Sequence, residues 1–456
     1  TFMLSTKVGK EAYVEPIIED GGYRFKVKVG KPKNAEATKN GTKSGTSGSI
    51  FFCLISGTPM PFEYLRSEAK AGRMGARLMA IVAEGDRGRV YLSPTSEMEN
   101  IALKAQPKNA PETDLPKKAL GFRIQEYGMT RWCDLFTPRQ LVALTTFSEL
   151  VHEACEHTKQ DTLFLNNQGE RELPEMDYRD ASVYSDAIAL YLAFAVDRMA
   201  MTGNSLVRWN SVGEKAQHCF GRQALPMLWD FAEPNFLASA TGSIDAAIFY
   251  SYDPLNWMQP ITFGISKQED ATTQATSKMK VVSTDPPYYD NIGYADLSDF
   301  FYVWLRQSLK PIYYDLFTTL AVPKAEELVA TQYRHGSKAK AEKFFLDGMT
   351  SAMKRLADQS HHGFPVTIYY AFKQAEIDEE KGYVSTGWDT FLGAVIDAGF
   401  VINGTWPIRT EMKTRQVAME TNALASSIVL VCQKRLQNAP IATRREFIIT
   451  LQKELP

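Results

Sequence analysis

Residues 280–291 read Lys-Val-Val-Ser-Thr-Asp-Pro-Pro-Tyr-Tyr-Asp-Asn, a short β-branched run followed by two prolines and two aromatic residues. The run predicts a strand over 279–283 that ends just before Asp285. The strand cannot continue into the prolines, because neither carries a backbone N–H group. An Asp/Asn-Pro-Pro-aromatic string arises by chance in about one chain of this length in a hundred, since proline makes up about 5% of residues. We therefore interpret the turn at Asp285 as functional.

The sequence after residue 278 alternates between strand and helix patterns. The expected helix after the turn places an apolar stripe at helical spacing, which we expect to face a sheet. This stripe consists of Leu297, Phe300, Phe301, Trp304 and Leu305. Further strands are expected at 365–372, 400–408 and 427–432, and a helix at 388–398. The alternation predicts an α/β sheet covered by helices, in which ligands bind at the carboxyl ends of strands, where Asp285 falls.

The preceding sequence has a different texture. Residues 11–29 predict a β-hairpin around the turn at 20–22. A loop is expected from residue 31 to residue 49, and further short strands are expected near 78–83 and 89–92. Three prolines in 105–118 suggest a linker. Two long helices are expected from Thr137 and from Tyr178, and we expect 234–276 to be irregular. We expect three regions: a β-rich insert over 1–118, a mainly helical region over 119–276 that is a candidate for DNA recognition, and a catalytic region over 277–456.

The bulk composition restricts the class of protein. The chain has 456 residues, 44% hydrophobic and 23% charged, which is typical of a globular protein of two or three domains. Lysine and arginine number 51 against 53 acidic residues, so any nucleic-acid surface must be a local patch. Five scattered cysteines favour the cytoplasm, and no apolar run is long enough to span a membrane. Because the first residue is Thr1, we expect a piece of a longer protein.

The residues of the turn suit the chemistry of an amino group. The lone pair of an exocyclic amino group on adenine or cytosine is delocalised into the ring, and acceptors that bind its N–H groups can free it. The Asp285 carboxylate and the Pro286 carbonyl supply two such acceptors, while Pro287 keeps the turn extended. Tyr288 offers a face for stacking on a base that has left the duplex. The alternative is a plain strand-ending turn with an exposed Asp and a core Tyr.

The string Asp285-Pro286-Pro287-Tyr288 resembles the catalytic motif of amino-group DNA methyltransferases. The longer string over 288–301 is similar to one subfamily, the large adenine-specific DNA methylases with a zinc-ribbon insert. Other similar stretches lie at 61–64 with 70–75, 134–140, 220–227 and 421–427. The resemblance implies a Rossmann-like methyltransferase sheet, S-adenosylmethionine as donor and adenine N6 in DNA as acceptor.

Two departures from the family pattern stand out. No glycine-rich S-adenosylmethionine loop precedes the catalytic motif, so we expect the sheet to lack its N-terminal half and the donor site to need a missing N-terminal segment or a partner. The family's ribbon uses two Cys-x-x-Cys pairs, of which only Cys53 remains, with Ser56 in the second place. One thiol cannot complete a tetrahedral zinc site, so we expect no metal.

Two basic stretches are candidates for contacts with DNA phosphates, although a solvated surface is an equally good interpretation of each. The first holds Lys26 and Lys28, and the second holds Arg334, Lys338 and Lys340. The leading hypothesis is a truncated adenine-N6 DNA methyltransferase that needs its missing segment or partner for activity. The alternatives are a non-catalytic DNA-recognition or scaffold subunit and a cytosine-N4 methyltransferase, which the four-residue motif alone does not separate from the adenine enzyme.

Overall fold

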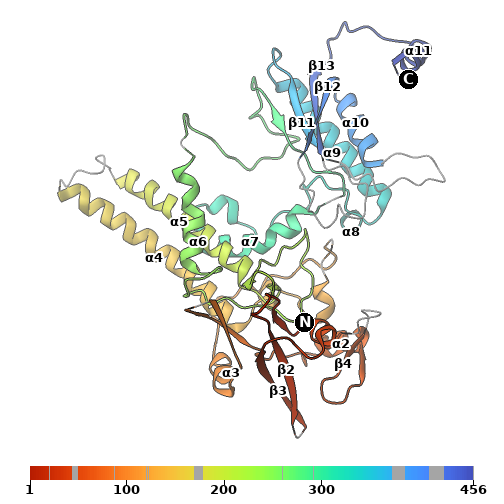
Figure 1. The fold of residues 1–456 in the computed structure, drawn as a ribbon. Helices are drawn as coiled ribbons and strands as arrows, with labels where there is room; N and C mark the ends of the chain where they lie inside the picture. The colour runs from red at the N-terminus through yellow and green to blue at the C-terminus, as the bar shows by residue number, and fades with distance from the viewer. Residues whose placement is uncertain are drawn as a thin grey trace. The chain divides into compact units, whose positions relative to one another are not determined.

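The computed structural model describes residues 1–456 except 20, 44–49, 87, 120, 122, 169–177, 259, 291, 372–385, 410–425 and 455–456. The fold is mixed α/β, with about 41% helix and 17% strand arranged in small sheets. Figure 1 traces the chain, which divides into two compact units. The first unit holds residues 1–264 and 294–323, and the second holds 265–293 and 324–456.

The first unit contains one three-stranded sheet and three strand pairs, all antiparallel. The strands are β1 (Met3–Ser5), β2 (Ala12–Glu19), β3 (Gly22–Val29), β4 (Ile50–Phe52), β5 (Pro59–Pro61), β6 (Ile81–Gly85), β7 (Gly88–Leu92), β8 (Trp209–Asn210) and β9 (Lys215–Ala216). The expected hairpin is confirmed as β2 and β3, and the expected strands at 78–83 and 89–92 correspond to β6 and β7.

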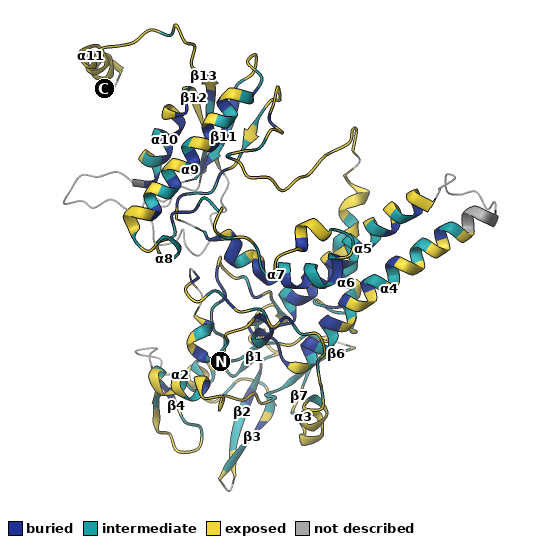
Figure 2. Cartoon of the chain, turned by 180° about the vertical axis from the view of Figure 1, so that it is seen from behind, coloured by how far each residue is buried: buried dark blue, intermediate teal, exposed yellow. Residues whose placement is uncertain are grey.

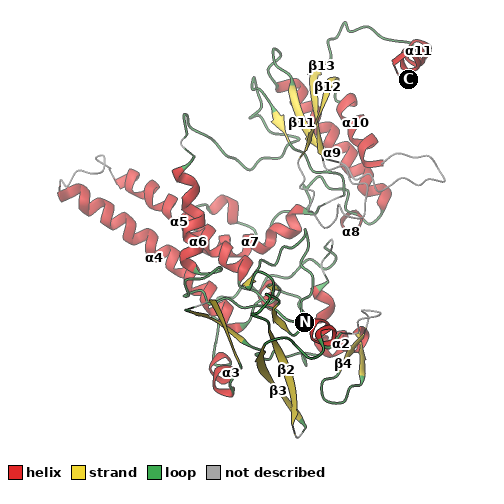
Figure 3. Cartoon of the chain, in the orientation of Figure 1, coloured by secondary structure: helices red, strands yellow, loops and turns green. Residues whose placement is uncertain are grey.

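The helices of the first unit include a long antiparallel pair, α4 and α5, which Figure 3 shows side by side. The helices are α1 (Ala35–Asn40), α2 (Phe62–Lys70), α3 (Ser96–Ala102), α4 (Pro138–Gln168), α5 (Tyr178–Thr202), α6 (Ile244–Tyr252) and α7 (Tyr294–Leu309). Single 3₁₀ turns lie at Ile124–Tyr127, Trp132–Leu135, Asp253–Asn256 and Tyr314–Phe317. The Thr137 hydroxyl accepts from the Gln140 amide and the Gln140 side chain accepts from the Thr137 amide, a capping box that starts α4 as expected.

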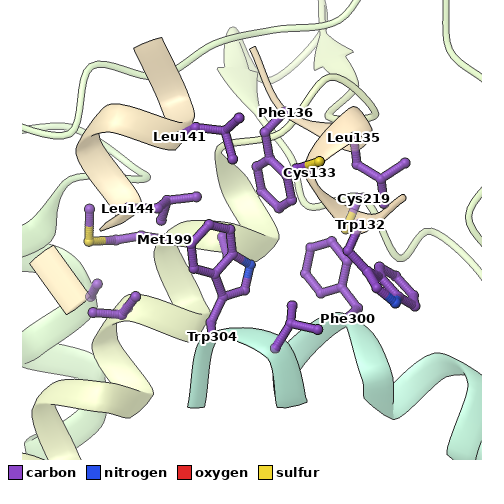
Figure 4. Packing of buried hydrophobic residues seen from close by; sticks show 14 of the residues in the cluster. Trp132, Cys133, Leu135, Phe136, Leu141, Leu144, Met199, Cys219, Phe300 and Trp304 are labelled. Carbon is purple, nitrogen blue, oxygen red and sulfur yellow. The ribbon is translucent and has the colours of Figure 1, made fainter. Parts of the chain in front are cut away.

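The core of the first unit corrects one expectation from the sequence. Phe300 and Trp304 of α7 are fully buried among side chains of α4, α5 and the 3₁₀ turn before α4, not against a sheet (Figure 4). Phe136 stacks on Phe300 and meets Trp304 edge-on, with ring centroids 5.9 and 5.2 Å apart. An apolar helical stripe specifies burial but not the surface that buries it, and here other helices supply that surface.

Two further expectations were wrong in this unit. The proline-rich stretch at 105–118 is no free linker, because Leu115 is buried in the same core. The stretch at 234–276 contains the helix α6, whose Ser243 caps the amide of Ala246.

The second unit is built on one four-stranded sheet in the order β10-β11-β13-β12. β10 and β11 are parallel, whereas β13 runs antiparallel to both β11 and β12. The strands are β10 (Ser283–Thr284), β11 (Val366–Tyr370), β12 (Phe400–Arg409) and β13 (Ser426–Lys434). The helices are α8 (Gln332–His335), α9 (Lys338–Gln359), α10 (Thr386–Asp397) and α11 (Arg444–Glu454).

Helices α9 and α10 cover one face of this sheet. Along β11, Val366, Ile368 and Tyr370 are buried while the residues between them are partly exposed, the alternation of a strand with one covered face (Figure 2). Phe345 of α9 and Phe391 of α10 belong to the same buried cluster. The expected α/β sheet covered by helices is thus present. The strand expected over 279–283 was wrong in its bounds, because β10 contains only Ser283 and Thr284.

Candidate active site at the end of β10

The Asp-Pro-Pro-Tyr turn begins where β10 ends. Ser283 and Thr284 pair in register with Thr367 and Ile368 of β11, and the hydroxyls of Ser283 and Thr367 lie 3.0 Å apart. Asp285 follows directly and is exposed, while Pro286 is buried and Pro287 is half-buried. Since neither proline can donate a ladder hydrogen bond, the turn leaves the sheet at this point, as the sequence predicts. Both strands present their carboxyl ends here, the edge at which α/β sheets bind ligands.

The carboxylate of the turn is oriented by its own tyrosine. The Tyr288 hydroxyl donates to Asp285 Oδ1 at 2.6 Å, and Tyr288 is Asp285's one hydrogen-bond partner among the described residues. No donor within the described chain bonds the Pro286 carbonyl. The turn therefore offers a carboxylate oxygen and a carbonyl oxygen to an incoming donor, the two acceptors expected from the sequence.

An aromatic cluster supports the ring of Tyr288. Its ring meets that of Tyr370 edge-on at 5.2 Å, and Tyr370 stacks on Phe391 at 4.0 Å. Trp388 lies 5.6 Å from Tyr370, ring to ring. Burial, followed by the nearby charge of Asp290, raises the pKa of Tyr370, so its phenol stays protonated at neutral pH. Tyr370 ends β11, and the rule that sites gather at the carboxyl ends of parallel strands could have identified it from the sequence.

Tyr289, the next residue, has an unusual backbone conformation. Its φ is +50°, a left-handed value that costs a bulky side chain about 1–3 kcal/mol. The Tyr289 hydroxyl donates to Glu342 Oε1 at 2.8 Å, and its carbonyl accepts from the Ala330 amide at 2.9 Å. Its ring packs edge-on against Phe345, with centroids 5.3 Å apart. Nothing in the sequence pattern marked Tyr289 or Glu342, because the contacts join positions 53 residues apart.

The basic residues proposed for DNA contacts have differing surroundings. Arg334 has a side chain only 10% exposed, and its guanidinium pairs with Glu327 at 2.5 Å, which favours a structural role. Lys338 is 69% exposed and lies 4.0 Å from Glu342, and Lys340 is exposed in the first turn of α9. Both lysines lie in the first turn of α9, at the positive end of the helix dipole. Positive charge is unfavourable there, so a bound anion would stabilise this end of the helix.

The first basic stretch carries less net charge than the sequence suggests. Lys28 pairs with Glu15 at 3.4 Å, and Lys26 lies opposite the same Glu15 in the β2–β3 register. Arg24, on the same face, pairs with Glu19 at 2.8 Å. Glu15 thus pairs with Lys28 and lies across the strand ladder from Lys26.

The remaining expectations concern a metal site, a membrane span and the family-like string at 421–427. Within the described ranges, no group of three or more His, Cys, Asp and Glu side chains is placed to hold a metal ion. Cys53 lies in the turn between β4 and β5, where its carbonyl accepts from Gly57. The described part of the chain has no helix with the length and apolar character to cross a membrane. Residues 421–425 of the family-like string lie outside the described residues.

Comparison of the chain with family models, with curated proteins and with solved structures finds no significant match. The interpretation of the site therefore rests on its own residues and geometry.

Proposed function

We propose that residues 277–456 carry the catalytic half of a Rossmann-like, S-adenosylmethionine-dependent DNA methyltransferase that acts on the N6 amino group of adenine. The observation that carries the proposal is the position of Asp285–Tyr288 at the carboxyl end of β10, beside the parallel strand β11. An exposed carboxylate and a carbonyl that no described residue bonds suit, at this edge, the two N–H groups of an exocyclic amine.

The turn's chemistry would work by positioning. Asp285 and the Pro286 carbonyl would accept the two N–H groups and free the nitrogen lone pair to take the methyl group that a completed S-adenosylmethionine site would supply. The nitrogen then loses one proton to solvent. Tyr288 stacks on the flipped adenine, and holding the reacting atoms in line supplies much of the rate.

The donor site requires residues beyond those described. β10 has one described neighbour, β11, so its other edge is open to a further strand. Parallel sheets bind ligands between neighbouring strands and are normally covered on both faces. We propose that a further segment or a partner chain adds strands at β10 and brings the S-adenosylmethionine loop that the described residues lack.

A second candidate function is a non-catalytic DNA-recognition or scaffold subunit. The hydrogen bond from Tyr288 to Asp285 favours it, since it occupies one acceptor position of the carboxylate. Cytosine N4 is the alternative acceptor, because the same two oxygens fit its amino group.

A titration of the purified chain with S-adenosylmethionine separates these functions. The proposal predicts weak or no binding by the chain alone and binding after an upstream segment or a co-purified partner is added. Tight binding by the chain alone would refute the incomplete donor site. Absence of binding in every combination, together with intact DNA binding, would support the scaffold.

A further inference from the structure

Within the turn at 285–290, Tyr289 is the one residue whose backbone is left-handed. Contacts with neighbouring segments stabilise this conformation. A strained conformation of this kind persists only where several contacts determine it, and such sites cluster at functional positions. Among the described residues, three separate segments of the second unit contact Tyr289.

The first contact fixes the side chain. The Tyr289 hydroxyl donates to Glu342 Oε1 at 2.8 Å, and the ring is 9% exposed against Phe345. Glu342 is partly exposed and lies 4.0 Å from Lys338, one turn earlier on α9, so its charge has a partner. Helix α9 therefore contacts the turn through both Glu342 and Phe345.

The second contact fixes the backbone. The Tyr289 carbonyl accepts from the amide of Ala330 at 2.9 Å. Since the left-handed φ rotates the peptide that follows Tyr289, this hydrogen bond depends on that conformation.

The third contact is steric. A Cβ atom at Gly387 would lie 3.1 Å from Cγ of the Tyr289 ring, closer than side chains normally approach. Glycine at this position in the first turn of α10 leaves space for the ring. The ring therefore fits between α9 and α10.

We infer that Tyr289 is a positioning residue, latched by Glu342 and accommodated by Gly387, that sets the direction of the Asp285–Tyr288 turn. The inference rests on the proposed function, because it assigns the latch to the same site. Tyr289 is adjacent to Tyr288, whose hydroxyl orients the Asp285 carboxylate, so a shift of the latch moves both groups. The latch itself touches no reacting atom.

Hydrogen exchange tests the latch without requiring activity. The Ala330 amide is the reporter, because Tyr289 accepts its hydrogen bond. We expect Tyr289→Phe and Glu342→Ala to speed exchange at Ala330 about threefold to tenfold, while Glu342→Gln, which keeps an acceptor, stays near the wild-type rate. Tyr302→Phe is the matched control, since it removes a tyrosine hydroxyl bonded to Thr319 in the first unit.

Unchanged exchange at Ala330 in Tyr289→Phe and Glu342→Ala would overturn the inference. So would an equal rise at Leu430, which pairs with Ile368 in the sheet, because that pattern reports general loosening of the unit.

Methyl transfer by the completed enzyme gives the second readout. We expect Tyr289→Phe to lower kcat by up to about 100-fold with KM for DNA unchanged, and Glu342→Gln to restore most of it over Glu342→Ala. A parallel loss of kcat and DNA affinity would contradict positioning. If wild type transfers no methyl group while the exchange pattern holds, the latch stands and the proposed function fails.

Discussion

Asp197 is a buried carboxylate whose effect on the free energy of unfolding can be measured. It lies on α5 in the core of the first unit and is 9% exposed, and its Oδ1 atom has no hydrogen-bond partner among the described residues. Burial raises its pKa well above the usual range. The folded protein therefore holds a proton that the unfolded chain releases at the same pH, so stability is lost as pH rises above the unfolded pKa of a carboxyl group.

The substitution Asp197→Asn keeps the shape and removes the ionisation. Between the unfolded and folded pKa values, the free energy of unfolding of wild type should fall relative to Asp197→Asn by up to about 1.4 kcal/mol per pH unit. The neutral groups bury similar polar atoms, so the two proteins should be nearly equal at pH 4. By pH 8 we expect Asp197→Asn to be the more stable protein, by about 1.4 kcal/mol for each pH unit by which the folded pKa of Asp197 exceeds the unfolded one.

Urea unfolding of both proteins between pH 4 and 8 provides the measurement. Asp161→Asn is the matched control, because Asp161 is exposed on α4 and its replacement should leave the pH profile unchanged. If wild type and Asp197→Asn keep a constant difference across this range, the reasoning about the buried carboxylate is refuted.

Three further predictions concern stability. Burial alone would raise the pKa of Glu214, but hydrogen bonds from Lys7 and Tyr91 outweigh it and lower the pKa to about 2. The resulting stabilisation, at most about 3 kcal/mol, should be present above pH 4.5 and lost toward pH 2. In thermal melts, Glu214→Gln should remove this dependence of the melting temperature on acid pH. Trp304→Ala, which removes a fully buried ring, should cost about 3–5 kcal/mol by urea denaturation, and a loss under 1 kcal/mol would contradict its place in the core. Gly203→Ala should cost about 1–3 kcal/mol because the added methyl group would overlap the Phe236 ring; an unchanged melting temperature would count against that packing.

Local features of the sequence predicted local structure well. The β2–β3 hairpin follows from alternation around a glycine turn, and the start of α4 follows from Thr137 and Gln140, whose capping contacts need no distant residue. The strand order could not be read in the same way, because pairing of β11 with β13 depends on residues about 60 positions apart. The prediction that α7 packs against a sheet failed for the same reason, because its contacts are with residues distant in the sequence.

At the candidate site, the sequence predicted the turn but not its support. The motif located Asp285 and Tyr288, since strand-ending residues and prolines are local signals. Glu342 and Gly387 were missed, because only the folded chain brings them to Tyr289. Arg334 was interpreted as a surface cation, yet it is nearly buried beside Glu327. A charged residue's exposure is set by its tertiary partners, which a single sequence does not list.

The exposed lysines at the start of α9 are the part of the proposed DNA surface that lies near the latch. Lys338 and Lys340 begin α9, the helix that also carries Glu342, so a phosphate bound there would lie on the same helix as the latch. Replacing Lys340 with Gln should weaken DNA binding and reduce its dependence on salt by about one counterion. Equal salt slopes for wild type and variant would remove Lys340 from the proposed surface.

Asp285 provides the most direct test of the central claim. The wild-type chain, with the upstream segment or partner that completes it, is expressed in cells whose DNA lacks N6-methyladenine, and the nucleosides of their digested DNA are quantified by mass spectrometry. The account predicts N6-methyladenine with wild type and with the exposed-acid control Asp389→Ala, and none with folded Asp285→Ala. N4-methylcytosine instead would change the acceptor, and equal methylation by Asp285→Ala and wild type would contradict the assignment of the turn as the catalytic site.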